Sequence, residues 1–183
     1  MTDRQVRSVD MSEFEVRASL REISGVVVPF NTPTRIGNYV ETFQRGAFAR
    51  TIVERGTRVK LLFAHDLARP LGRAVSLVEE QRGLVGTFKV ANTAAGNDAL
   101  ELIANGAIDS FSVGFQPVVD DWSQARDRVT RTECKLLETS LVTLPAFETA
   151  RIESMRSADV YDPNFDPHVI RARLALLFLG ATQ

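Results

Sequence analysis

Histidine is scarce in this chain, which limits where acid–base chemistry with an imidazole could occur. The sequence has 2 histidines, and His168 lies in a stretch near the end where the pattern of secondary structure is weak. His65 instead follows the short apolar run Val59 to Ala64. An imidazole takes up and returns a proton near neutral pH, which is the task of a general base beside a hydroxyl nucleophile. His65 is therefore the candidate base, and the alternative is a strand-end histidine satisfied by a neighbouring carbonyl.

The candidate nucleophiles are two serines, Ser110 and Ser112, within the stretch Asp109 to Phe115. If this stretch is a strand, its alternation puts the aromatic residues on one face and both serines on the other. Gly114 follows Ser112 by two residues and leaves room for the backbone of a substrate. The commoner fate of such serines is to line the solvated face of an edge strand. The pattern alone leaves both possibilities open.

A carboxylate is needed to orient the imidazole and to stabilise its charged form. Glu138 interrupts the apolar run Leu136 to Val142, and a buried carboxylate needs a partner. Asp66 is adjacent to His65 in the sequence, so in an extended strand it points to the opposite side. We rank Glu138 first and keep Asp66 as the alternative. Glu138 could equally be a structural partner for an arginine.

The elements that must position these residues are mostly strands, with two helices. Strands are expected at 14–30 (with a possible bend at Gly25), 39–43, 59–64, 70–79, 83–90, 108–119 and 128–143, and helices at 46–55 and 93–105. The segment 31–38 is expected to be a loop. Most strands would pair with a neighbour in sequence. We therefore predict an α+β fold, a mainly antiparallel β-barrel with a few surrounding helices.

Composition and charge exclude several classes of function. The chain of 183 residues has 44% hydrophobic and 25% charged residues, which fits one soluble globular domain. Its net charge of -1 gives no broad reason to expect nucleic acid or a membrane surface as partner. A single cysteine, Cys134, and the absence of zinc-type or phosphate-binding spacing predict no metal and no cofactor. No apolar run has the length of a membrane span and no signal peptide is seen, so a cytoplasmic location is expected.

Three segments are expected along the chain. Residues 1–12 are predicted to be a flexible N-terminus, residues 13–152 the structured domain, and residues 153–183 a linker and C-terminal tail. The tail contains several Asp and Pro residues followed by an apolar stretch, Val169 to Leu179. It could be a docking or self-cleaved segment, or a terminal helix that closes the core.

An ordered series of segments resembles the prohead proteases of tailed phages and of related gene-transfer particles. The segments are GVVVPFN at 25–31, ETFQRGAF at 41–48, LLFAHD at 61–66, PLG at 70–72, GL at 83–84, Gly106, SVGF at 112–115 and ETSLVTLPA at 138–146. No single segment is diagnostic, and the specificity comes from their order and spacing over residues 14–150.

The resemblance implies a serine endopeptidase with a fold similar to that of the herpesvirus assembly proteases. The family histidine falls on His65 and the family serine falls on Ser112, not on Ser110. Glu138 matches a recurring acidic position. The implied substrates and partners are the scaffold and the major capsid precursor, cut by acyl transfer inside the procapsid in the host cytoplasm, by a homo-oligomer.

Two other classes of function compete with this expectation. One is a non-catalytic capsid-assembly or scaffolding protein of the same fold, in which the serine is incidental. The other is a small esterase, which lacks support because the chain has no Gly-x-Ser-x-Gly motif.

Overall fold

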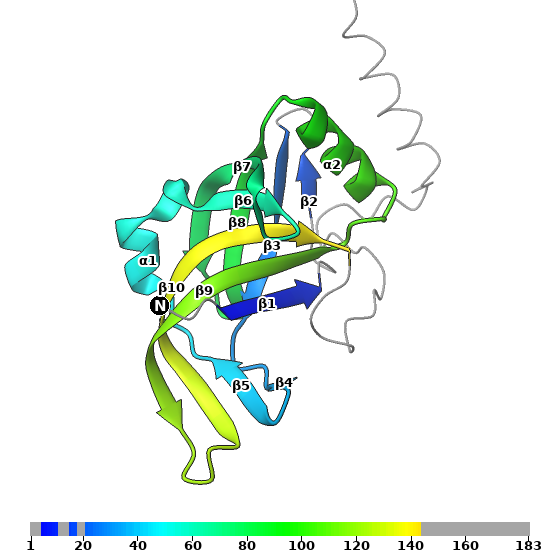
Figure 1. The fold of residues 1–183 in the computed structure, drawn as a ribbon. Helices are drawn as coiled ribbons and strands as arrows, with labels where there is room; N and C mark the ends of the chain where they lie inside the picture. Colours follow the sequence, from blue (N-terminus) through cyan, green and yellow to red (C-terminus); the bar gives the residue numbers. More distant parts are fainter. Residues whose placement is uncertain (1–4, 11–14, 18–20, 144–183) are drawn as a thin grey trace, which may run out of the picture.

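The computed structural model describes residues 5–10, 15–17 and 21–143, and most of these residues belong to one β-sheet (Figure 1). The strands are β1 (Gln5–Asp10), β2 (Glu15–Arg17), β3 (Glu22–Pro29), β4 (Thr34–Ile36), β5 (Tyr39–Phe43), β6 (Lys60–Phe63), β7 (Asp66–Glu79), β8 (Gly83–Val90), β9 (Ser110–Trp122) and β10 (Arg128–Val142). The helices are α1 (Ala49–Glu54), the short 3-10 helix η2 (Gly56–Arg58) and α2 (Ala94–Ala104). No helix in this part of the chain is long and apolar enough to cross a membrane.

The sheet is open, which corrects the prediction of a barrel. Its main path runs β1-β9-β10-β6-β7-β8-β3-β2, and β5 branches from β10 with β4 beside it. A barrel requires its first and last strands to pair. Here the path ends on two short strands that bind different neighbours, β1 on β9 and β2 on β3. The fold is therefore mostly β-sheet with few helices, and all pairs are antiparallel except those of β10 with β5 and with β6.

Several predicted elements are confirmed and the N-terminal ones differ in detail. The hairpins β7–β8 and β9–β10 and both helices form as expected, and the Thr93 hydroxyl caps α2 by accepting from the Gly96 N–H. The first apolar stretch forms two antiparallel strands, β2 and β3, and Gly25 lies within β3 opposite Gly86, just before a shift in register with β8 between Val26 and Val28. The predicted loop 31–38 contains β4, and the segment 1–12, expected to be flexible, contains β1.

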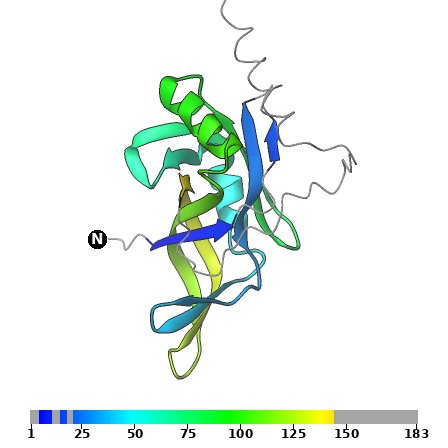
Figure 2. The same cartoon turned by 90° about the vertical axis from the view of Figure 1, so that its right-hand side faces the viewer.

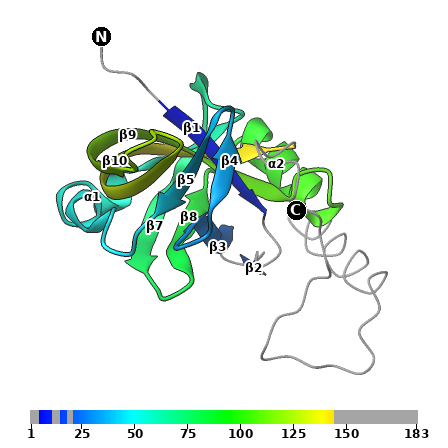
Figure 3. The same cartoon turned by 90° about the horizontal axis from the view of Figure 1, so that it is seen from below.

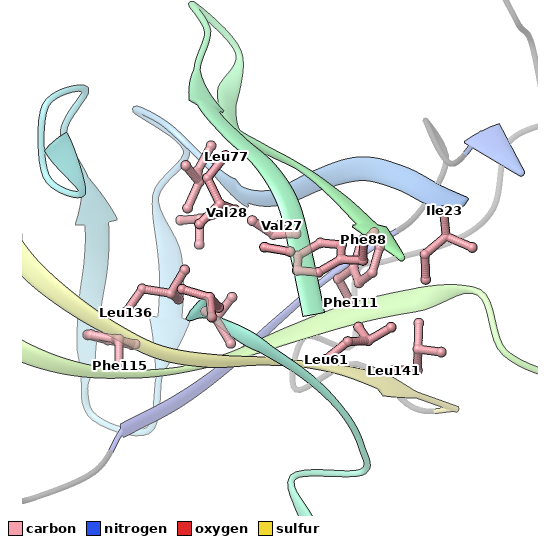
Figure 4. Packing of buried hydrophobic residues seen from close by; sticks show 14 of the residues in the cluster. Ile23, Val27, Val28, Leu61, Leu77, Phe88, Phe111, Phe115, Leu136 and Leu141 are labelled. Atoms are coloured by element: carbon pink, nitrogen blue, oxygen red, sulfur yellow. The ribbon is translucent and has the colours of Figure 1, made fainter. Parts of the chain in front are cut away.

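The core lies where the curved sheet faces itself. Figure 4 shows side chains of β3, β7 and β8 packed toward those of β6, β9 and β10. Phe88 and Phe111 meet in this layer with ring centroids 5.4 Å apart. Helices α1 and α2 lie far apart at the margins of this body (Figure 3). Two inner faces of one sheet thus bury each other, as the two sheets of a sandwich do.

A buried ion network joins strand β5, which branches from the main path of the sheet, to strands β9 and β10. Arg131 on β10 is 1% exposed, and its guanidinium donates to Glu41 on β5 and to Asp120 on β9, at 2.7 and 2.5 Å. The β4–β5 hairpin therefore runs beside the part of the β9–β10 hairpin that lies next to its turn (Figure 2). The burial of Arg131 is not expected from the sequence, because charged residues around a polar turn are typical of a solvated hairpin tip.

Candidate active site

His65 lies in a two-residue turn between β6 and β7. Ala64 and His65 have positive φ angles of 48° and 60°, as the tightest antiparallel hairpins require at both turn positions. Neither residue is glycine, so this left-handed backbone is unfavourable and must be held from outside. The Ala64 N–H donates to the Leu141 carbonyl at 2.9 Å and the His65 N–H donates to the Ser140 hydroxyl at 3.0 Å. Strand β10 therefore holds the turn that presents the imidazole.

Ser112 lies in β9, next to β10 and β1. The alternation predicted for this stretch is confirmed on its apolar side, because Phe111, Val113 and Phe115 all belong to the core. The alternative of a solvated serine face does not hold, since Ser110 and Ser112 are 2% and 0% exposed. Strand β9 is paired on both sides, with β1 and with β10, and β10 places Ser140 directly opposite Ser112.

A bulge in β10 turns Glu138 toward the serine. Leu136 and Leu141 both lie in the core although they are five positions apart, and strict alternation would put them on opposite faces. The register with β9 shifts between Leu136 and Glu138. The extra residue changes which side chains face the core. Glu138 and Ser140 consequently share the face that holds the imidazole, as their hydrogen bonds show.

The three candidate residues form one chain of hydrogen bonds. His65 Nδ1 lies 2.8 Å from Glu138 Oε1, and His65 Nε2 lies 2.6 Å from Ser112 Oγ. A carboxylate can only accept, so in the neutral imidazole the proton is on Nδ1 and Nε2 is free to accept the serine proton. The Glu138 side chain is 4% exposed and that of His65 is 20% exposed. The arrangement can activate a hydroxyl and stabilise the imidazolium that results.

The other two described candidates, Asp66 and Ser110, form hydrogen bonds with residues close to them in the sequence. Asp66 is exposed, and its Oδ1 accepts from the Ala68 N–H at 2.8 Å. The Ser110 hydroxyl donates to the neighbouring Asp109 at 2.9 Å. His168 lies outside the described residues. Thus Glu138, and not Asp66, faces the imidazole.

Ser140 is the site residue that sequence reasoning missed. Its hydroxyl donates to Glu138 Oε2 at 2.7 Å in addition to accepting from His65 N–H. The feature of the sequence that could have indicated Ser140 is its position two residues after Glu138, which places both side chains on one face of a strand. Among the described residues, no group of three or more His, Cys, Asp or Glu side chains could hold a metal ion.

A hydroxyl, an imidazole and a carboxylate linked in this order are the arrangement found in serine hydrolases, here placed on a β-rich fold. The sequence profile of the caudovirus prohead serine proteases matches residues 7–163. The chain belongs to this family.

Individual relatives agree with the family assignment. The prohead protease of Escherichia phage T5 is 28% identical over 102 residues, which is 56% of this chain and 48% of the relative. The prohead protease of Enterobacteria phage HK97 is 30% identical over 118 residues, 62% of this chain and 52% of the relative. The chain thus spans about half the length of these curated relatives.

A solved structure supports the fold. The bacteriophage T4 capsid assembly protease aligns with a TM-score of 0.57 at 12% identity, covering 76% of this chain and 97% of that one. At this identity the likeness concerns the fold alone.

Proposed function

We propose that this chain is a serine endopeptidase of procapsid maturation, with Ser112 as nucleophile, His65 as general base and Glu138 as the orienting acid. The observation that carries the proposal is the hydrogen-bond chain from Glu138 Oε1 through both ring nitrogens of His65 to Ser112 Oγ. The family membership supports the same reaction.

The proposed reaction is acyl transfer in two stages. His65 Nε2 removes the Ser112 proton while Oγ attacks the peptide carbonyl, and the imidazolium then gives that proton to the leaving amine. Glu138 stabilises the imidazolium during this step without taking the proton. A water molecule, deprotonated by the same nitrogen, releases the acyl group and restores the Ser112 hydroxyl.

The proposed substrates are the scaffold segment and the major capsid precursor, cut inside the procapsid in the host cytoplasm. Confinement in a shell raises the effective concentration of substrate and offsets weak intrinsic affinity. We further propose that the enzyme is a homo-oligomer with neither nucleic acid nor membrane as partner. Residues 13–152 are the proposed protease domain, related in fold to the herpesvirus assembly proteases, and residues 153–183 the proposed docking or self-cleaved tail.

Co-expression with the cognate capsid precursor tests the proposal. Wild type, Ser112→Ala, His65→Ala and Ser110→Ala are compared by intact-mass analysis of the precursor. We expect trimming by the wild type and by Ser110→Ala, and none by the other two variants. Ser110→Ala is the matched control, because Ser110 is also buried in β9 and its hydroxyl bonds only locally to Asp109 among the described contacts.

The same experiment distinguishes the non-catalytic alternative. If the Ser112→Ala and His65→Ala variants trim as the wild type does, or if no variant trims while all of them bind the precursor, the assembly-protein function is favoured and the proposed protease is rejected.

A further inference from the structure

The Ser140 hydroxyl occupies a junction behind the candidate active site. The residue is 0% exposed and lies on β10 directly opposite Ser112 on β9. Its hydroxyl accepts from the backbone N–H of His65 at 3.0 Å and donates to Glu138 Oε2 at 2.7 Å. One buried oxygen thus contacts both the backbone of the candidate base and the side chain of the candidate acid.

The direction of both hydrogen bonds follows from the chemistry of the groups. A backbone N–H can only donate and an ionised carboxylate can only accept, whereas a hydroxyl does both at once. The Ser140 hydroxyl therefore accepts a hydrogen bond from the His65 N–H and donates one to the Glu138 carboxylate. The bond leaves Glu138 Oε1 for the imidazole and gives the second oxygen of this buried carboxylate a donor.

The hydrogen bond from the His65 N–H to Ser140 matters because the backbone of His65 has an unfavourable conformation. Ala64 and His65 both have left-handed backbones, a conformation that non-glycine residues keep only where the surroundings hold them. Ser140 and the Leu141 carbonyl supply the hydrogen bonds from β10 to this turn. If the turn relaxes, the imidazole moves away from Ser112 Oγ, which it meets at 2.6 Å.

We propose that Ser140 is a positioning residue that locks the His65 turn and the Glu138 carboxylate into one unit, and so holds the imidazole in reach of Ser112. This inference rests on the proposed function of the site. Ser140 acts through His65 and Glu138 and does not touch the reacting atoms. Its loss should therefore reduce the reactivity of Ser112 and leave substrate affinity nearly unchanged.

Two variants of equal shape distinguish the effect of the hydroxyl group from the effect of side-chain packing. Ser140→Thr and Ser140→Val add the same bulk at the same buried position, but only threonine retains a hydroxyl. Ser140→Ala removes the hydroxyl without added bulk. Thr139→Val is the matched control, because Thr139 is the adjacent residue of β10, is 0% exposed, and has an Oγ1 with no hydrogen-bond partner.

The first measurement is the rate at which a fluorophosphonate labels Ser112 in the full chain, since this reagent reports nucleophile reactivity without substrate recognition. We expect Ser140→Val and Ser140→Ala to label on the order of 10- to 100-fold more slowly than Ser140→Thr, as misplaced catalytic groups do. Thr139→Val should label like the wild type. With a precursor-derived peptide, the loss should appear in kcat and not in KM.

The second measurement is the proton NMR signal of His65 Nδ1–H, which reports its hydrogen bond to Glu138. The downfield signal should be present in the wild type and Ser140→Thr and be shifted or lost in Ser140→Val and Ser140→Ala. Melting temperatures of all variants identify any that fail to fold, and Ser140→Ala, the smallest change, carries the comparison if Ser140→Val is unfolded.

Equal labelling rates for folded Ser140→Ala and Ser140→Thr, with the same Nδ1–H signal, would overturn the inference and leave the proposed function intact. Failure of the proposed function looks different. In that case wild type is labelled no faster than Ser112→Ala, and none of the Ser140 variants matters.

Discussion

The two ring nitrogens of His65 have different partners, and this difference defines the roles at the site. Glu138 occupies Nδ1 at 2.8 Å and Ser112 occupies Nε2 at 2.6 Å. A carboxylate on Nδ1 selects the tautomer in which Nε2 can accept a proton. Asp66, although next to His65 in sequence, bonds to the backbone of Ala68. An experiment can therefore distinguish whether Glu138 or Asp66 is the carboxylate that orients the imidazole.

We expect Glu138→Gln to lower the rate of Ser112 labelling and of precursor cleavage by about 10⁴-fold, the effect expected when an amide favours the wrong tautomer. Asp66→Asn is the matched control, a carboxylate-to-amide change one residue from His65, and should retain activity. Both rates are measured with fluorophosphonate and with precursor under identical conditions. Greater loss in Asp66→Asn than in Glu138→Gln would show that Asp66 is the orienting acid.

At the scale of elements, the hairpin β6–β7 carries His65 and depends on close packing of β7 against β8. Gly72 lies in β7 between Leu61 of β6 and Val90 of β8. A Cβ added to Gly72 would lie 2.0 Å from the Lys89 carbonyl oxygen. This neighbour is backbone and cannot rotate away, so a side chain at position 72 must separate the two strands.

We expect Gly72→Ala to lower the free energy of unfolding by roughly 1–3 kcal/mol, the usual cost of overpacking. Urea denaturation followed by circular dichroism measures the effect. Ser76→Ala, at an exposed position of the same strand, should change stability by no more than about 0.5 kcal/mol. An unchanged midpoint for Gly72→Ala would mean that β7 and β8 are further apart than described.

At the scale of the whole molecule, the fold also buries a reactive side chain that has no part in the active site. Cys134 on β10 is 1% exposed, and its N–H donates to the Ala47 carbonyl beside α1. Burial raises the pKa of the Cys134 thiol from 9.0 to about 12. Since the thiolate is the nucleophile, the folded protein protects this side chain from alkylation.

We expect iodoacetamide at about pH 8.5 to leave Cys134 unmodified in the native protein and to modify it in guanidinium chloride. Mass spectrometry measures the extent of modification. Between 9.0 and about 12 the folded state keeps the thiol proton that the unfolded state releases, so the stability from this group falls as pH rises through that window. Cys134→Ala should lack this part of the pH dependence. Rapid alkylation of the native protein would contradict the burial of Cys134.

Local patterns in the sequence were sufficient for many of the elements. A polar turn between two apolar runs predicts the hairpin β7–β8, and Thr93 followed by an apolar face predicts α2, because turns and caps depend on neighbouring residues. Scarcity of histidine singled out His65, and the resemblance to a family selected Ser112 over Ser110. Glu138 stands out in the sequence because a carboxylate in an apolar strand needs a partner.

The tertiary structure decided which partners these residues have. The contacts of His65 with Ser112, Glu138 and Ser140 join positions 47, 73 and 75 residues apart. The bulge before Glu138 depends on register with β9. The sheet is open because the two strands that end its path, β1 and β2, pair with different neighbours. Residue type and short-range spacing determine the available chemistry and the local conformation, whereas strand register, the open form of the sheet and the bridge at Ser140 are decided only when distant strands pair.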